Sequence, residues 1–223
     1  MRKQLLKPLV FTVCLLPLAI LGWQLYAGLL GANPVDELAD SSGEWTLRFL
    51  LITLLATPLR RWFGWTWTLR VRRMLGLYAF FYAGLHLFTY LWLDQFFDWG
   101  EVWLDLLERP FITAGMLAFM LLLPLAMTSS HYMMRRLGRG WKRLHRLAYI
   151  VPVLGVLHYW WLVKADVLEP MVYGAVLAVL LGSRIKVSRT AGAVVAKPGK
   201  RKWHEPYPVQ VTEVKREYGS SRP

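Results

Sequence analysis

The sequence predicts an all-α integral membrane protein, a six-helix bundle with both termini in the cytoplasm. The chain of 223 residues is 56% hydrophobic and only 18% charged, whereas an ordinary globular domain is about 45–50% apolar and about 25% charged. Long apolar runs alternate with short polar segments, and the positive charges gather in every second polar segment. Aromatic residues make up 14% of the chain, and together with the Leu-rich runs they exclude a disordered protein.

Six apolar segments are predicted to cross the membrane, because a bilayer core about 30 Å thick needs about 20 apolar residues in a helix. They are 8–30, 45–59, 74–93, 111–128, 144–163 and 167–182. The second and sixth are short, so we expect interfacial aromatic and arginine side chains to complete them. A cleaved signal peptide is the alternative for the first segment. Its apolar run of 22 residues is longer than the about 7–15 of a signal core, which favours a retained span.

The distribution of charge predicts the orientation of these helices. Taken alternately, the polar segments on one side of the membrane hold 24 Lys and Arg against three Glu, whereas those on the other side hold three against eleven acids. One face therefore carries +21 and the other −8, and positive short loops stay in the cytoplasm. The net charge of +13 thus orients the bundle and does not indicate a nucleic-acid partner.

Two domains follow from this reading, a transmembrane domain over 1–183 and a basic cytoplasmic tail over 184–223, for which we expect little order. The single cysteine, Cys14, excludes an internal disulfide, an iron–sulfur site and a CxxCH haem attachment. No GxGxxG or GxxxxGK[ST] loop is present, and no internal repeat is evident. The tail is too short for a flavin or nicotinamide domain.

Ionisable residues inside a membrane are costly and are therefore candidates for function. His86 lies 12 residues after Met74, and His158 lies 14 residues after Leu144. At about 1.5 Å per residue, the two reach about 18 and about 21 Å from the inner ends of their spans. Two imidazoles at one depth on neighbouring helices can bind a haem iron from opposite faces. The alternative is that each histidine only makes a hydrogen bond to a neighbouring helix.

His145 is a third candidate, 13 residues before His158 and about 20 Å from it along a helix. Thirteen steps of about 100° leave the two rings about 140° apart, although Pro152 could kink the span between them. In the third span, Arg72 and Arg73 lie at the depth in the membrane where a histidine that pairs with His145 would be needed. His145 therefore has three alternatives: an unconventional second haem, a contact with a propionate or quinone, or a place among interfacial bases. We do not expect His131 or His204 to be ligands.

Four stretches of the chain resemble the MsrQ (YedZ) family, which belongs to the ferric-reductase-like transmembrane group. They are RRMLGLYAFFYAGLHL (72–87), ERPFITAGMLAF (108–119), LPLAMTSS (123–130) and WKRLHRLAYIVPVLGVLHYWWLVK (141–164). The resemblance implies a b-type cytochrome of the bacterial inner membrane, also associated with FMN. Its partner would be MsrP, a periplasmic molybdopterin enzyme that repairs oxidised methionine in proteins. His86, His145 and His158 stand where the family carries its haem-associated histidines.

The same resemblance implies an electron-transfer subunit of an oxidoreductase system. Related oxidases carry cytosolic flavin and nicotinamide domains, which this chain lacks. Electrons would therefore enter at the basic face, from membrane quinol or from a separate flavin reductase. Arg72, Arg73 and Arg143 are the candidates to hold haem propionates or the phosphate of FMN, because an Arg fork suits such anions. The predicted orientation of the helices in the membrane would by itself explain why these three positive residues lie there.

Two aromatic-rich segments flank the predicted spans. Trp62, Trp65 and Trp67 are expected to form an aromatic belt at the inner interface rather than a flavin-stacking site. The acidic outer segment 94–109 is expected to lie in the interface as an amphipathic stretch and to offer a surface for a partner. Two other functions remain open from sequence. One is a ferric-chelate reductase with the same haem and another acceptor, and the other is a transporter or assembly protein without redox chemistry.

Overall fold

The structure is a computed structural model that describes residues 2–163 and 167–191. Within these residues it contains helices and no strands. The long helices are α1 (Arg2–Tyr26), α2 (Pro34–Phe63), α3 (Trp67–Thr89), α5 (Pro110–Met127), α8 (Ile150–Leu162) and α9 (Leu168–Ala191). Three short helices lie between them, α4 (Trp99–Glu108), α6 (His131–Leu137) and α7 (Arg139–Leu144). Most of the predicted tail, from residue 192 on, lies outside the described residues.

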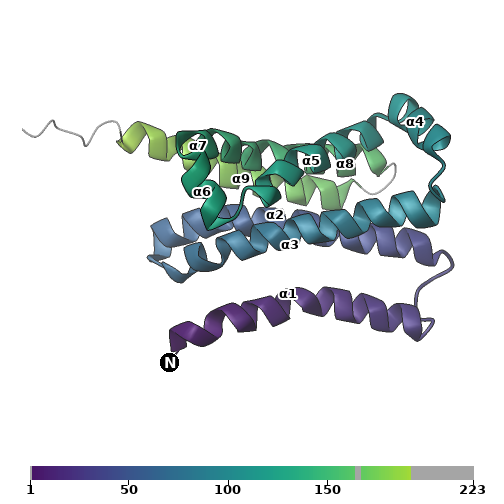
Figure 1. Ribbon diagram of the computed structural model, residues 1–223, viewed down its shortest axis with the longest axis horizontal. Coiled ribbons are helices and arrows are strands. Elements are labelled where there is room, and N and C mark those ends of the chain that lie inside the picture. The colour runs from purple at the N-terminus through teal and green to yellow at the C-terminus, as the bar shows by residue number, and fades with distance from the viewer. Residues whose placement is uncertain (1, 164–166, 192–223) are drawn as a thin grey trace, which may run out of the picture.

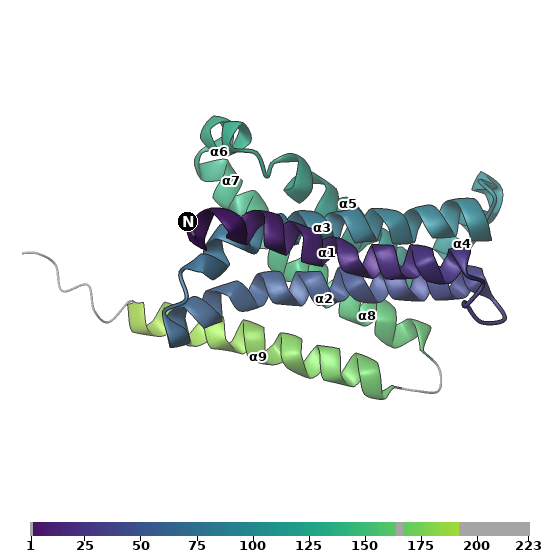
Figure 2. The same ribbon diagram turned by 90° about the horizontal axis from the view of Figure 1, so that it is seen from below.

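The long helices run side by side along the bundle (Figure 1). The pair α2 and α3 occupies the middle, with α1 on one side and α5, α8 and α9 on the other. Seen from the side of α1, that helix crosses the face of the pair, and α9 follows the edge next to α2 (Figure 2). The helices α6 and α7 lie at one end of the bundle and α4 at the other.

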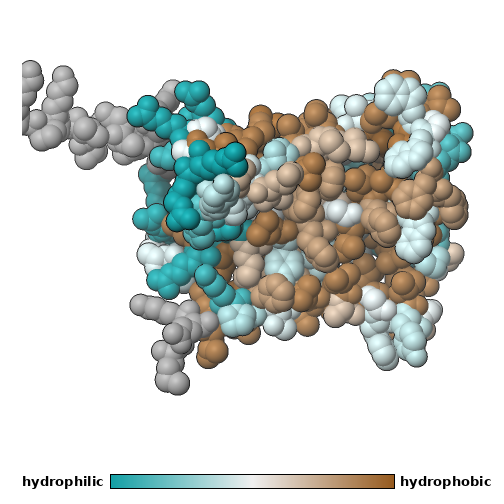
Figure 3. Space-filling view, in the orientation of Figure 1, coloured by the Kyte–Doolittle hydropathy of each residue, from teal (hydrophilic) through white to brown (hydrophobic). Residues whose placement is uncertain are grey.

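In the described residues, three helical stretches are long and apolar enough to cross a bilayer. They are Leu5–Tyr26, Trp67–Asp94 and Pro110–Met127. The space-filling view shows an apolar band across the middle of this face, with hydrophilic residues gathered at the end that carries α6 and α7 (Figure 3). Many large apolar side chains of the long helices are exposed, including Leu9 of α1, Phe81 of α3 and Leu117 of α5. A surface of this kind suits lipid rather than water.

The predicted span 144–163 is not one continuous helix. The chain leaves α7 at Leu144, passes through the 3₁₀ turn η2 (His145–Tyr149) and enters α8 at Ile150. Pro152 lacks the N–H that would bond the carbonyl of Ala148, and its ring crowds that carbonyl. The tighter 3₁₀ turn lies at this carbonyl, so the proline accounts for the break.

Two tyrosines of α3 fasten α1 to the bundle. The Tyr82 hydroxyl donates to the Cys14 carbonyl at 2.9 Å and accepts from the Leu18 N–H at 3.1 Å. Pro17 lies between these two residues and has no N–H, so it interrupts the backbone hydrogen-bond pattern of α1. The Tyr82 hydroxyl supplies hydrogen bonds at this place. One turn away, the Tyr78 hydroxyl donates to the Phe11 carbonyl at 3.0 Å.

A second proline-related contact holds α9 against α2. Pro58 lies inside α2 and cannot donate to the carbonyl of Leu54, four residues earlier. Arg184 of α9 supplies the missing donor, because its Nη2 donates to the Leu54 carbonyl at 2.6 Å. Its Nη1 donates to the Tyr149 hydroxyl at 2.7 Å. The arginine therefore joins α2, η2 and α9 at the end of the bundle opposite α4.

Candidate functional site

His86 and His158 face each other in the bundle, although 72 positions separate them in the chain. His86 lies near the C-terminal end of α3, and His158 lies in the second half of α8. Their ring centroids are 6.0 Å apart, and the ring planes are inclined by 80°. The structure therefore brings together the two histidines that the sequence analysis paired.

A backbone carbonyl of a neighbouring helix orients each imidazole. The Nδ1 of His86 lies 2.8 Å from the carbonyl oxygen of Ala39 in α2, and the Nδ1 of His158 lies 2.6 Å from that of Phe111 in α5. A carbonyl only accepts, so each Nδ1 must carry the proton and donate. Each Nε2 is then deprotonated and free to bind a metal, which is the arrangement that ligating histidines usually show.

A glycine makes room for each ring. A Cβ added to Gly43 of α2 would come within 3.1 Å of His86 Nδ1 and 3.2 Å of Cε1. A Cβ added to Gly115 of α5 would come within 2.8 Å of His158 Nδ1 and 3.0 Å of Cε1. Each glycine follows the carbonyl that holds its histidine by one helical turn. The bare backbone therefore lets the imidazole lie against the helix and reach that carbonyl.

Both imidazoles line one cavity of about 620 Å³ between α2, α3, α5 and α8. Its inner walls are apolar, with Leu50, Phe119 and Val151 among them. The outer rim is polar and carries the acids Asp36, Asp40, Glu44 and Asp94. A volume between about 300 and 1,000 Å³, mostly apolar walls and a few polar groups are typical of a small-molecule or cofactor site.

The geometry of the two histidines fits a haem iron. A metal–imidazole bond is about 2 Å long and Nε2 lies about 1 Å from the ring centre, so two opposed rings on one iron have centroids about 6 Å apart. The observed 6.0 Å matches this spacing. The part of the chain described here holds no group of three or more His, Cys, Asp or Glu that could bind a bare metal ion. Two facing imidazoles suit a cofactor that brings the remaining iron ligands itself, as haem does.

The other predicted residues lie elsewhere. His145 begins η2 and stacks on Trp141, with ring centroids 3.9 Å apart and its Nδ1 3.3 Å from the Trp141 carbonyl. Neither it nor Arg72, Arg73 or Arg143 lines the cavity. Arg72 is partly buried, whereas Arg73 and Arg143 are exposed. His131 is exposed at the start of α6, and His204 lies outside the described residues.

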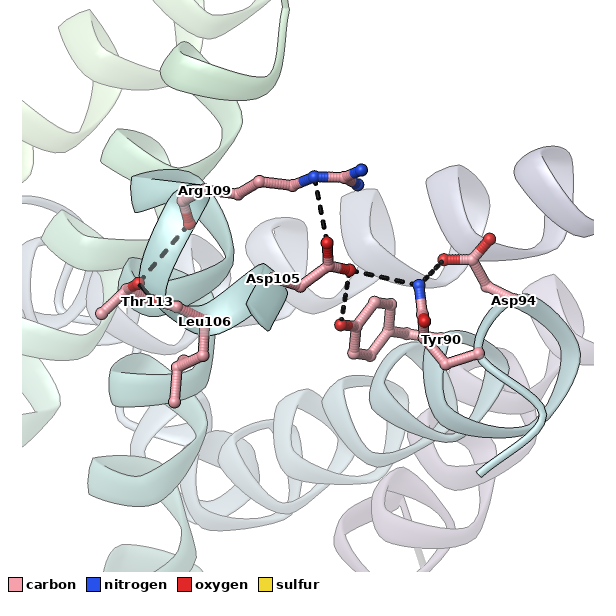
Figure 4. A network of polar contacts seen from close by, with 7 residues as sticks. Tyr90, Asp94, Asp105, Leu106, Arg109 and Thr113 are labelled. Atoms are coloured by element: carbon pink, nitrogen blue, oxygen red, sulfur yellow. Dashed lines mark hydrogen bonds and ion pairs between the residues drawn. The ribbon is translucent and has the colours of Figure 1, made fainter. Parts of the chain in front are cut away.

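Sequence reasoning missed a polar network at the outer rim of the cavity (Figure 4). The carboxylate of Asp105 lies at its centre and is buried. One oxygen accepts from the Tyr90 hydroxyl at 3.0 Å and from Gln95 Nε2 at 3.1 Å, and the other pairs with Arg109 Nε at 3.1 Å. The sequence signal for this network was the pair Arg109–Pro110 between α4 and α5. The proline disfavours a helical conformation at Arg109, which places the cation next to the helix that carries Phe111.

Fold and site together define a helical membrane protein with two facing histidines in a cofactor-sized cavity. Residues 42–156 match the family model described as ferric reductase like transmembrane component. The chain is 52% identical over 185 residues to the protein-methionine-sulfoxide reductase heme-binding subunit MsrQ of Rhodospirillum rubrum, covering 82% of this chain and 89% of that protein. The chain therefore belongs to the MsrQ family, within the ferric-reductase-like transmembrane group.

Other members bearing the same name show the same extent of similarity. The protein of Xanthomonas euvesicatoria pv. vesicatoria is 52% identical over 185 residues, covering 80% of this chain and 85% of its own length. That of Herminiimonas arsenicoxydans is 50% identical over 184 residues, covering 81% and 84%. No solved structure matches the chain significantly.

Proposed function

We propose that this chain binds a b-type haem between His86 and His158 and carries electrons across the bacterial inner membrane. The observation that supports this most directly is the pair of imidazoles, 6.0 Å apart, each with Nδ1 held by a carbonyl and Nε2 free. Haem iron, when bound, supplies reversible one-electron transfer. The protein contributes ring orientation through Ala39 and Phe111 and an apolar enclosure that excludes water.

The direction of transfer follows from the proposed topology. The six spans lie in α1, α2, α3, α5, the segment of η2 and α8, and α9, with both termini in the cytoplasm. The basic loops then face inward, and the acidic rim of the histidine cavity faces outward. A haem in this cavity lies near the outer face, where it can deliver electrons to a periplasmic partner.

The acceptor we propose is MsrP, the periplasmic molybdopterin enzyme that reduces methionine sulfoxide in oxidised proteins, in a heterodimer with this chain. The proposal rests on the similarity to heme-binding subunits named as parts of a methionine-sulfoxide reductase. Reduction of a sulfoxide to a thioether consumes two electrons and two protons. Two successive one-electron transfers through this chain would therefore support each repair.

At the inner face, the proposed donor is membrane quinol or a cytosolic flavin reductase. FMN is the second proposed cofactor, and Arg72, Arg73 and Arg143 are the candidates for its phosphate. These residues lie at the basic end of the bundle, where α3 begins and α7 ends, and so does His145, which we propose as a contact for FMN, quinone or a second haem. His145 stacks on Trp141, so a planar ring system could extend that stack.

Spectra of the purified protein test the haem assignment. We expect a Soret band and a reduced-minus-oxidised spectrum of a b-type haem in the wild type and in the His131→Ala control, whose side chain is exposed. His86→Ala and His158→Ala should each lose most of the bound haem. Full haem content in both variants would refute the axial assignment, and a colourless wild type would favour a transporter or assembly protein.

The match to the ferric-reductase family supports one alternative acceptor, a ferric chelate. The chemically reduced protein can be mixed with ferric citrate or with the molybdoenzyme and methionine sulfoxide. Reoxidation by the second mixture and not by the first supports the proposed pathway. The opposite result would assign the chain to ferric-chelate reduction.

A further inference from the structure

Arg109 occupies a fixed position at the rim of the histidine cavity. It links α4 to α5 with extended backbone angles, φ −112° and ψ 95°, and the following Pro110 disfavours a helical conformation there. Its backbone N–H donates to the Asp105 carbonyl at 2.9 Å. Phe111, whose carbonyl orients His158, lies two residues further on. The arginine is thus held close to one of the two proposed haem ligands, and it lines the same cavity.

The side chain of Arg109 is held at Nε. This atom lies 3.1 Å from one oxygen of Asp105, whose side chain is only 10% exposed. Tyr90 and Gln95 donate to the other oxygen at 3.0 and 3.1 Å, so the carboxylate cannot easily turn away. Tyr90 lies one turn beyond His86, at the end where α3 becomes the π-helical turn η1 (Tyr90–Asp94). The network therefore connects the end of the helix that carries His86 to the start of α5, whose Phe111 carbonyl holds His158.

The outer edge of the guanidinium has no protein partner in the described part of the chain. In that part of the chain only Nε has a partner, neither Nη atom donates to an acceptor, and the side chain is 55% exposed. Among the described residues that line the cavity, Arg109 is also the only Arg or Lys, whereas Asp36, Asp40, Glu44 and Asp94 are acids. An anionic group at this rim would therefore be repelled at most positions and attracted at Arg109, whose N–H fork matches a carboxylate.

We propose that Arg109 binds a propionate carboxylate of the haem, with Asp105 as the positioning residue that aims its free edge into the cavity. This assignment rests on the proposed function. It replaces Arg72, Arg73 and Arg143 in that role, since none of them lines the cavity. A charge-assisted hydrogen bond of this kind contributes about 1.5–3 kcal/mol. Loss of the guanidinium should therefore weaken haem binding by about tenfold to about a hundredfold.

Reconstitution of the apoprotein with haem b and with haem dimethyl ester tests this assignment, because the ester has no carboxylates. We expect the wild type to bind haem b about tenfold to a hundredfold more tightly than the ester. Arg109→Gln should bring this ratio close to one, and its haem should also have a lower midpoint potential, because a positive charge has been removed. Arg109→Lys keeps the charge without the fork and should give an intermediate ratio.

Glu108→Gln is the matched control, since Glu108 is the exposed neighbour and does not line the cavity. It should keep the wild-type ratio, whereas Asp105→Asn should lower the ratio in part. An unchanged ratio in both Arg109→Gln and Arg109→Lys would overturn the role of Arg109 and leave the proposed haem site standing. Failure of the wild type to bind either porphyrin would instead refute the proposed function. If Arg109→Gln does not fold, Arg109→Lys and Asp105→Asn decide the question.

Discussion

The imidazole of His158 lies against the backbone of Gly115, where an added Cβ would come within 2.8 Å of Nδ1 and 3.3 Å of Cγ. Contacts below about 3 Å are not tolerated, so Gly115→Ala must move the ring or the helix. The ring cannot move without lengthening its 2.6 Å contact with the Phe111 carbonyl. The equivalent contacts at Gly43 are 3.1 and 3.2 Å and can relax by a smaller shift of His86.

Gly115→Ala is therefore expected to weaken haem binding more than Gly43→Ala, with a loss of about tenfold or more for the former, or about 1.4 kcal/mol. The measurement is haem content per protein after purification, together with the Soret maximum. Gly22→Ala is the control, because nothing lies within 4 Å of that position on α1. Equal haem content in Gly115→Ala and Gly22→Ala would show that the close approach is not required.

The pairing of His86 with His158 could be predicted from sequence, because two ionisable residues in apolar runs at similar depth are informative. The groups that orient them could not, since a backbone carbonyl has no side-chain signature. In the structure, both carbonyls lie 47 residues before the histidine that they hold, and both are followed by a glycine one turn later. This matched spacing was not evident as a sequence repeat, because most of the surrounding residues differ.

The position of the arginine that lines the cavity was also beyond sequence reasoning. Clustered charge made Arg72, Arg73 and Arg143 the candidates, yet the predicted orientation in the membrane accounts for that clustering as well. Arg109 stands alone among acids, and only the fold shows that it borders the cavity. Which isolated charge lies next to a ligand depends on which helices pack together. The periodicity of apolar residues locates the helices but does not specify their neighbours.

The contact between Arg184 and Leu54 leads to a second prediction. Arg184→Met removes the donor from a carbonyl that Pro58 already leaves without its helical partner, so it should lower stability by about 1–3 kcal/mol. In a Pro58→Ala background, the introduced alanine has an N–H that can bond the same carbonyl, and the cost of Arg184→Met should be smaller. Thermal unfolding of the four proteins in detergent measures the difference. An equal cost in both backgrounds would contradict the compensating role of the arginine.

Cys14 provides a probe of how firmly α1 is attached. It is the only cysteine in the chain and only 4% exposed, next to the hydroxyl of Tyr82. Replacing Tyr78 and Tyr82 by Phe removes the hydrogen bonds to α1 at about 1 kcal/mol each, and local opening should become more frequent. We expect a membrane-permeant maleimide to label Cys14 on the order of tenfold faster in this double variant. The exposed Tyr132→Phe control should label at the wild-type rate.

The carboxyl of Asp40 gives a dependence of stability on pH, and it lies at the outer end of α2, before the predicted span 45–59. Asp40 is exposed at the rim of the cavity, yet the residues around it remove part of its hydration, which raises the pKa of its carboxyl, and the nearby charges of Asp36 and Glu37 raise this pKa further. A raised pKa means that the folded protein favours the protonated acid. The corresponding stability is fully present below the unfolded pKa of about 3.9 and is lost as the pH rises through the higher folded pKa.

Asp40→Asn mimics the protonated acid at every pH, so it should unfold at a higher temperature than the wild type at pH 7. The advantage should shrink as the pH falls through the folded pKa toward about 3.9, because the wild-type acid then becomes protonated as well. Melting curves of the two proteins across this range, with Glu108→Gln as a control that does not line the cavity, measure the difference. If Asp40→Asn melts below the wild type at pH 7, the ionised carboxylate stabilises the rim, and the charge repulsion inferred there is wrong.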